Sequence, residues 1–294
     1  MKTVFSADRA KRFLFSFIAA FLPLFLGISC LPGLRNISLS EVETFRNYAF
    51  SGFHGVEASG NYDIRLISAS KDSICVYADS ALFPYMKIEE KNGILTFGFK
   101  ESLRLDKENT GIHVDVFYAG VELDVLRASG AARIQIEDNL HASSLEIRLT
   151  GASELEGMLK VHESLKIFMS GASSLKGDCR VNGQAKIKMS GSTSFIGDCT
   201  VTGKMNLELS GAGDIAWTGY AEKADVQLSG ASRFRGFDMM TEELFVIASG
   251  ASDMEITVNR KMKARVSGSS HIRYQGTPSV ESTVSGAGSV VPVR

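Results

Sequence analysis

The most chemically reactive side chains of this 294-residue sequence are its four cysteines. Two of them, Cys179 and Cys199, are 20 residues apart, which is one period of the repeat described below. Residues one period apart in stacked strands lie about 4.8 Å from each other, within disulfide range, although their parallel side chains hold the Cβ atoms further apart than a relaxed bond prefers. We therefore expect two buried, stacked thiols, with a disulfide as the alternative because an oxidising compartment would permit one.

The other titratable side chains do not suggest a catalytic centre. The histidines stand at unrelated positions of the repeat, so we do not expect them to converge: His54, His113, His141, His162 and His271. No cysteine or histidine spacing matches a metal motif, and we expect neither a metal nor a cofactor. Enzymes that process polysaccharides on a β-helix carry their acids and bases on long loops, for which these coils have no spare chain. The sequence predicts a protein that is not an enzyme, with a polysaccharide-processing enzyme as the alternative.

The first 29 residues have the pattern of a secretion signal. Four basic residues precede a run from Phe13 to Leu26 whose only polar residue is Ser16. The segment closes on Gly27-Ile28-Ser29-Cys30, which looks like a bacterial lipobox with its leucine one place too early. We expect residues 1–29 to be a signal peptide, Cys30 to be lipidated and residues 30–46 to form a lipid-anchored tether. The alternatives are cleavage after the serine without a lipid, or an uncleaved anchor.

A short phrase, Ser-Gly-Ala-Ser or a near variant, recurs every 18 to 21 residues in the second half of the chain. Glycine enters positive φ freely and a preceding hydroxyl hydrogen-bonds a turning backbone, so each phrase predicts a corner. The hydroxyls either satisfy their own corners, which we favour, or form a binding stripe. The predicted corners are Ser129 and Gly130, Thr150 and Gly151, Ser170 and Gly171, Ser190 and Gly191, Ser210 and Gly211, Ser229 and Gly230, Ser249 and Gly250, Ser267 and Gly268, and Ser285 and Gly286.

Apolar residues surround each corner at alternating positions. The residue before the phrase is apolar in every copy, and so is the residue five places after its first position, as in Met189 and Phe195. Alternation of this kind indicates strands with one buried face, and a unit of about 20 residues must stack on its neighbours to bury that face. Residues 129–294 are therefore predicted to form a right-handed parallel β-helix in an all-β protein. An antiparallel β-sandwich is the alternative.

Residues 47–128 show a looser pattern and are predicted to form an irregular β-rich cap. Ser59-Gly60 reads as a degenerate first copy of the phrase, and Asn92-Gly93 predicts a two-residue hairpin. The polar run 101–110 is expected to be a loop. A cap at this end covers the strand edge that an open solenoid would expose, and Pro292 suits the end of the last ladder.

The formal net charge of −1 gives no electrostatic reason to expect a nucleic-acid ligand. Charged residues are expected to be spread along the coils rather than gathered into a basic patch. Four aromatic residues, Trp217, Tyr220, Phe168 and Phe245, are expected near outward positions. Of these, Phe168 and Phe245 have polar neighbours and are candidates for stacking against sugar rings.

The repeats, the segment Phe53-His54-Gly55-Val56 with Gly60 and Ile64, and the lipobox-like leader together resemble the putative auto-transporter adhesin head GIN domain family. The resemblance covers roughly residues 50–288. It implies an exported protein, often a lipoprotein of Bacteroidetes, with no catalytic residues to carry over.

Together these patterns predict an envelope lipoprotein, anchored in the outer membrane and facing either the periplasm or the cell surface. Its β-helix would present an adhesin-like surface for a glycan or a protein. A purely structural envelope component remains a further alternative, because a fold does not determine a function.

Overall fold

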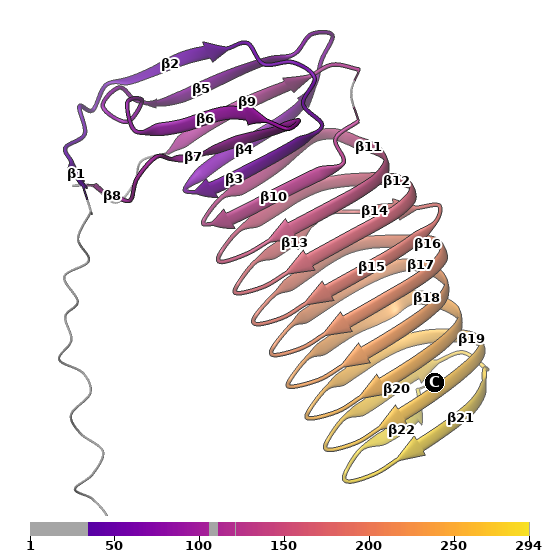
Figure 1. Cartoon of the computed structure of the whole chain (residues 1–294). Coiled ribbons are helices and arrows are strands. Elements are labelled where there is room, and N and C mark those ends of the chain that lie inside the picture. Colours follow the sequence, from indigo (N-terminus) through magenta and orange to yellow (C-terminus); the bar gives the residue numbers. More distant parts are fainter. Residues whose placement is uncertain (1–34, 106–110, 121, 294) are drawn as a thin grey trace, which may run out of the picture.

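The computed structural model describes residues 35–105, 111–120 and 122–293. These residues form a parallel β-solenoid of about eight turns that winds right-handedly, as predicted, closed at its N-terminal end by a β-rich cap (Figure 1). No helix capable of spanning a membrane occurs in this described part. The strands are β1 Arg35–Ile37, β2 Glu43–Tyr48, β3 Gly55–Gly60, β4 Tyr62–Ser68, β5 Ser73–Asp79, β6 Met86–Lys91, β7 Ile94–Phe99, β8 Leu103–Leu105, β9 Ile112–Tyr118, β10 Val125–Gly130, β11 Arg133–Leu149, β12 Glu154–Met169, β13 Ser174–Lys176, β14 Cys179–Val181, β15 Gln184–Met189, β16 Ser194–Leu209, β17 Asp214–Leu228, β18 Arg233–Ala248, β19 Asp253–Val266, β20 His271–Gln275, β21 Ser279–Val284 and β22 Ser289–Pro292.

Each coil pairs in parallel with the next at a shift of one repeat. Leu155 lies beside Leu175, which lies beside Phe195, and the same register continues along the stack. The strand segments that run into the corners form one sheet, which we call the corner sheet. It consists of β3, β10, residues 144–149, 164–169, 204–209, 223–228, 243–248 and 261–266 of the longer strands, β15 and β21.

The core is a set of apolar columns that run along the solenoid axis. Ile147, Ile167 and Ile187 are fully buried in successive coils, as the alternating pattern predicts. Trp217 was expected near an outward position, and that expectation is wrong because it stands two residues after the inward Ile215 and is 2% exposed. Its indole stands at a position that is glycine in the preceding coil, where Gly197 is its direct neighbour.

The cap continues the solenoid and then closes it with antiparallel strands. Ser59 and Gly60 pair with the first predicted corner, so β3 and β4 form the coil that precedes β10 and β11 in the stack. On the side away from the coils, β7 pairs with β3 and β9 pairs with β4 in parallel, whereas β5 and β6 pair with β9 and β7 in antiparallel fashion. The hairpin at Asn92-Gly93 is present, and both residues have positive φ.

The segment predicted as a tether is pinned to the cap over the part that the structure describes. β1 pairs with β8, inside the run that was expected to be a loop, and β2 pairs with β5. The Ser40 hydroxyl also donates a hydrogen bond of 2.6 Å to the Asp79 carboxylate. These strands are short and their partners lie 26 to 68 residues away in the chain, for example Tyr48 with Ile74 and Arg35 with Leu103. Local periodicity therefore gave no signal for them.

Candidate functional site

The corners position every outward side chain of the corner sheet, and their geometry requires glycine. The nine predicted corner glycines have φ between +71° and +83°. A Cβ on Gly191 would also lie 2.5 Å from the carbonyl oxygen of Gly171 in the preceding coil. Backbone strain and close coil-to-coil contact thus act together at each corner.

Several corner hydroxyls contact a backbone carbonyl of the preceding coil, and not their own corner as the sequence favoured. Ser190 Oγ lies 3.4 Å from the carbonyl oxygen of Met169, and the same carbonyl accepts the backbone N–H of Ser190 at 2.9 Å. Ser210 repeats both contacts with Met189. The bonds from the hydroxyls are long and weak, so these groups retain capacity for a ligand that reaches them.

A second column of hydroxyls lies inside the corners. Its members occupy the last position of the repeated phrase and are at most 1% exposed: Ser153, Ser173, Thr193, Ser232, Ser252 and Ser270. Ser232 donates a hydrogen bond of 3.1 Å to Ser252 in the next coil. Sequence reasoning did not single out this column, although its recurrence within the phrase was the available signal.

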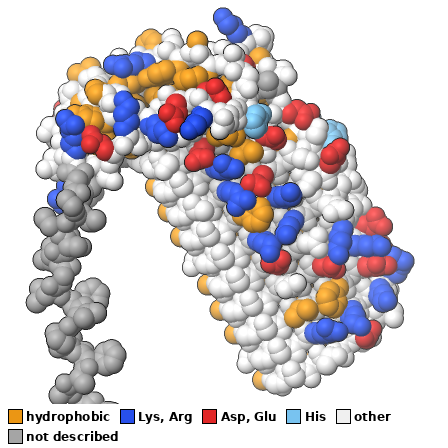
Figure 2. All heavy atoms as spheres, in the orientation of Figure 1, with side chains coloured by type: hydrophobic (Ala, Val, Ile, Leu, Met, Phe, Trp, Pro, Cys, Tyr) orange, Lys and Arg blue, Asp and Glu red, His pale blue; other side chains and the backbone are white. Residues whose placement is uncertain are grey.

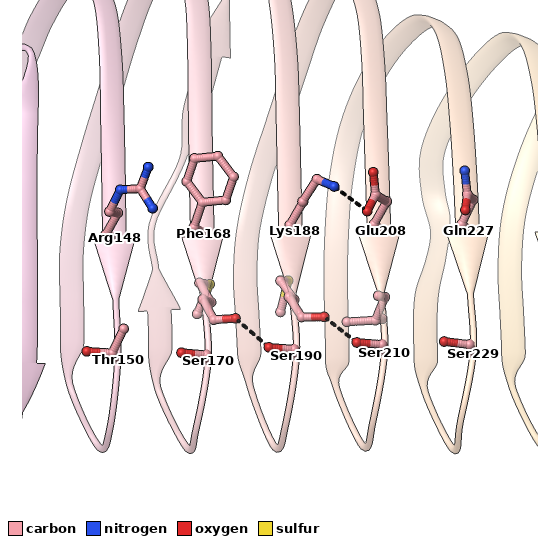
Figure 3. A pocket seen from close by; sticks show the side chains of 13 residues that line it. Arg148, Thr150, Phe168, Ser170, Lys188, Ser190, Glu208, Ser210, Gln227 and Ser229 are labelled. Carbon is pink, nitrogen blue, oxygen red and sulfur yellow. Dashed lines mark hydrogen bonds and ion pairs between the residues drawn. The ribbon is translucent and has the colours of Figure 1, made fainter.

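A shallow groove of about 440 Å³ runs along the corner sheet beside the corners. One wall is a row of outward side chains two residues before each corner, and the other wall is the row of corner hydroxyls (Figure 3). The first row is Arg148, Phe168, Lys188, Glu208 and Gln227, and the second is Thr150, Ser170, Ser190, Ser210 and Ser229. Because the rows follow the stack, the groove suits an elongated ligand parallel to the solenoid axis.

Charged groups in and beside the groove are held in place by short contacts. Lys188 Nζ lies 2.6 Å from a carboxylate oxygen of Glu208. The Arg148 guanidinium lies 4.6 Å from the centre of the Phe168 ring and donates a hydrogen bond of 2.7 Å to Glu146. This hydrogen bond holds the pKa of Glu146 below its usual value. The groove therefore offers cations, a carboxylate, an amide and one aromatic ring.

The predicted thiol pair lies in the core and does not line this groove. Cys179 is the direct neighbour of Cys199, both are fully buried, and both are free thiols. A hydrogen bond with Cys199, together with burial, raises the pKa of the Cys179 thiol well above its usual value. Cys30 lies outside the described residues.

The histidines stay apart, as their spacing suggested. His54 Nδ1 lies 2.7 Å from Asp124, and this hydrogen bond raises the pKa of His54. His113 Nδ1 lies 3.5 Å from Asp63 on another strand. None of the five histidines lines the groove, and no three histidine, cysteine or acidic side chains of the described residues are grouped for a metal ion.

Charge is not spread evenly over the coils, contrary to the expectation from sequence. From β10 to β21, the corner sheet carries ten basic and five acidic side chains, a net charge of +5, whereas the whole chain has −1. Figure 2 shows these charges gathered over the strands, beside a corner edge that is nearly free of them. Sequence reasoning missed this because it treated charges coil by coil and not sheet by sheet.

Residues 52–185 and 177–278 match the model of a protein family described as "Putative auto-transporter adhesin, head GIN domain". The chain belongs to this family. The predicted resemblance is thereby confirmed over the coils and most of the cap. No curated protein matches this head GIN chain.

Solved structures with the head GIN fold include two putative adhesins and one putative lipid binding protein. The adhesin from Parabacteroides merdae ATCC 43184 is 21% identical with a TM-score of 0.69, and that from Parabacteroides distasonis ATCC 8503 is 20% identical with a TM-score of 0.63. The lipid binding protein, also from P. distasonis ATCC 8503, is 18% identical with a TM-score of 0.61. Each alignment covers 88% of this chain and 100% of the other. At these identities the likeness shows the fold alone.

Proposed function

We propose that this head GIN protein is an envelope component without catalytic activity that binds a linear glycan in the groove beside its corners. The observation that carries the proposal is the placement of Phe168 in a polar row that faces a row of hydroxyls along several coils. Aromatic rings flanked by hydrogen-bonding groups suit sugars, whose faces are apolar and whose edges carry hydroxyls. The family's adhesin description agrees with a binding role.

The composition of the groove favours a glycan over the other ligand classes. Protein interfaces are anchored by several buried aromatic or arginine side chains, whereas this groove has one half-buried ring. One relative of similar fold is called a putative lipid binding protein. The charged and hydroxyl lining found here suits a polar chain better than an acyl chain.

The groove also lacks the features that would support the enzyme alternative. Its carboxylate, Glu208, is tied to Lys188 at 2.6 Å. It lies in a shallow groove and not in a water-excluding cavity, where perturbed acids and bases are normally found. A binding role requires neither a perturbed pKa nor a closed site.

The proposed location is the cell envelope, with the mature chain exported and anchored through a lipid on Cys30. The leader pattern and the family's exported character support this assignment. Cys30→Ala is expected to release the protein from membranes and abolish incorporation of labelled palmitate. Palmitate incorporation that persists in this variant would exclude Cys30 as the lipidation site.

The proposed binding is tested on a glycan array with the purified full chain and its Phe168→Ala variant. We expect Phe168→Ala to weaken binding of the captured glycan by about tenfold, since stacking on an aromatic ring is worth about 1–3 kcal/mol for nucleobases. Phe45→Ala is the matched control, because Phe45 is 59% exposed on β2 in the cap. The proposal would be contradicted if the chain captured no glycan, or if Phe168→Ala and Phe45→Ala bound the glycan equally well.

A further inference from the structure

A second hollow lies on the corner sheet, further along the stack and further from the corners. It has a volume of about 310 Å³ and lies over strands β16 to β19. Its lining contains one aromatic ring, Phe245, together with four lysines and two acidic residues: Lys204, Lys223, Lys261, Lys263, Asp225 and Glu243. Asp225 is the outward residue immediately before Gln227 of the groove on strand β17, so the two hollows adjoin.

The acidic residues neutralise only part of the positive charge around this hollow. Lys204 is paired with Asp225, and Glu243 contacts Lys223 at 3.7 Å and Arg260 at 2.6 Å. Lys263 is paired with Glu281 at 2.7 Å. Lys261 and Arg265 have no ion pair among the residues that the structure describes, and Arg265 instead lies 5.8 Å from the centre of the Phe245 ring.

The same excess occurs beside the first groove. Lys166 and Lys186 are direct neighbours on successive coils, both exposed, and neither forms an ion pair with a described residue. Like charges on adjacent strands destabilise a sheet. An anionic ligand would offset this repulsion at both places.

The two hollows also share a local arrangement. Phe168 and Phe245 are each half-buried and each contacted by an arginine from a neighbouring coil. Four coil steps separate their strands, from β12 through β15, β16 and β17 to β18, which corresponds to about 19 Å along the axis. A single extended chain can therefore reach both rings.

We propose that the corner sheet binds a linear acidic polysaccharide, whose sugar rings lie on Phe168 and Phe245 and whose carboxylate or sulfate groups lie against Lys166, Lys186, Lys261 and Lys263. This inference rests on the proposed glycan-binding function and names the class of its ligand. The ligand's anions provide partners for Lys166, Lys186 and Lys261, which have no ion pair among the described residues, and lie beside the Lys263–Glu281 pair.

Carboxylates among the lysines favour a sparsely charged ligand over nucleic acid. Duplex DNA carries about one charge per 1.7 Å of its axis, so the carboxylates of Glu208, Asp225 and Glu243 would lie close to phosphates. An acidic polysaccharide spaces its charges by whole sugar units. The same carboxylates can then accept hydrogen bonds from sugar hydroxyls between the charges.

The first test removes the two adjacent lysines of the second hollow in the full chain. We expect Lys261→Gln with Lys263→Gln to weaken binding of polygalacturonate or heparin by about tenfold. The matched control is Lys71→Gln with Lys91→Gln, which makes the same charge change at two exposed positions of the cap. Circular dichroism establishes that both variants are folded.

The second test changes the charge in the opposite direction. Asp225→Asn frees Lys204 and is expected to tighten binding of the acidic polymer about threefold, an effect that mere damage to the fold would not produce. Glu89→Gln in the cap, where Glu89 pairs with Lys87 at 2.9 Å, is the control and should leave affinity unchanged. Increasing salt is expected to weaken binding of the acidic polymer.

Polymers of different charge and chemistry distinguish the possible ligand classes. Polygalacturonate and heparin distinguish carboxylate from sulfate as the preferred anion, and binding of either supports the inference. Binding of neutral amylose alone, without salt dependence, would overturn the acidic ligand and leave the proposed glycan function intact. Equal or tighter binding of single-stranded oligothymidylate would overturn the inference in favour of nucleic acid, and binding of no polymer would contradict both proposals.

Discussion

The stacked coils and the N-terminal cap use the same strand-forming residues in different ways. In the coils, every strand pairs with the equivalent strand of the next repeat, so that Ile167 pairs with Ile187 and Ile187 with Leu207. In the cap, β2, β5 and β6 run antiparallel to their partners and close the stack. Their partners are not related by the repeat.

This difference gives the two regions different roles: the coils form an extended surface, and the cap closes the end of the stack. The coils give each outward side chain a direct neighbour at the equivalent position of the next coil, which creates rows of side chains and hence a groove. The cap creates no such rows, but it covers the strand edges that would otherwise be free to pair with another molecule. Variants that disturb one region and spare the other test this division.

The largest effect is expected from Trp217→Ala, because this indole fills the middle of the coil core. The ring packs edge-on against Phe195 at 4.9 Å and Phe234 at 5.7 Å, in the coils on either side. We expect a loss of about 3–5 kcal/mol in the free energy of unfolding, measured by urea denaturation with circular dichroism. Phe45→Ala in the cap is the control and is expected to change stability by less than about 0.5 kcal/mol. Equal losses would contradict the assignment of Trp217 to the core.

A smaller effect is expected from Gly191→Ala, and a glycine of the cap separates its two causes. Gly191 has φ +83° and stands where a Cβ would meet the carbonyl oxygen of Gly171 at 2.5 Å. Gly120 has φ +65°, but a Cβ there would have no neighbour within 4 Å. We expect a loss of about 3 kcal/mol for Gly191→Ala and about 1 kcal/mol for Gly120→Ala, since only the first adds a clash to backbone strain. Similar melting temperatures for both variants would show that coil contact adds nothing at the corners.

The coils could be predicted from sequence because their information is local and repeated. Alternating apolar residues and the corner glycines appear in each copy, so the register of Leu155 with Leu175 follows from counting. The pairing of β1 with β8 and of β2 with β5 depends on single contacts between distant segments. Such contacts leave no period in the sequence, and a tether was predicted where these strands lie.

The candidate site was only half visible in the sequence. Phe168, Phe245 and the corner hydroxyls were identified, because their outward parity follows from the alternation. The excess of lysines on the corner sheet emerges only when residues such as Lys166, Lys186 and Lys261 are placed on one face and their ion pairs are known. Trp217 was misplaced because its parity was not followed from the inward Ile215, two residues earlier.

The smallest effect is expected from Glu154→Gln, which tests whether ion pairs between coils add to the backbone ladder. The Glu154 carboxylate bridges three coils, with Arg133 at 3.0 Å and Lys176 at 2.7 Å, and its side chain is 18% exposed. The hydrogen bond from Lys176 is the main cause that lowers the pKa of Glu154. Because the folded pKa is depressed, the stabilisation is present above the unfolded value near 4.3 and is lost as the pH falls through the folded pKa.

We therefore expect Glu154→Gln to lower stability by about 0.5–1 kcal/mol at neutral pH, and the difference from the unmodified chain to vanish in acid. Urea denaturation at a series of pH values measures this difference. Glu89→Gln is the control in the cap, since the Glu89 side chain is 47% exposed and pairs with Lys87 on its own strand. A difference for Glu154→Gln that does not change with pH would mean that the side chain contributes through packing, and the coils would then depend on their backbone register and apolar columns alone.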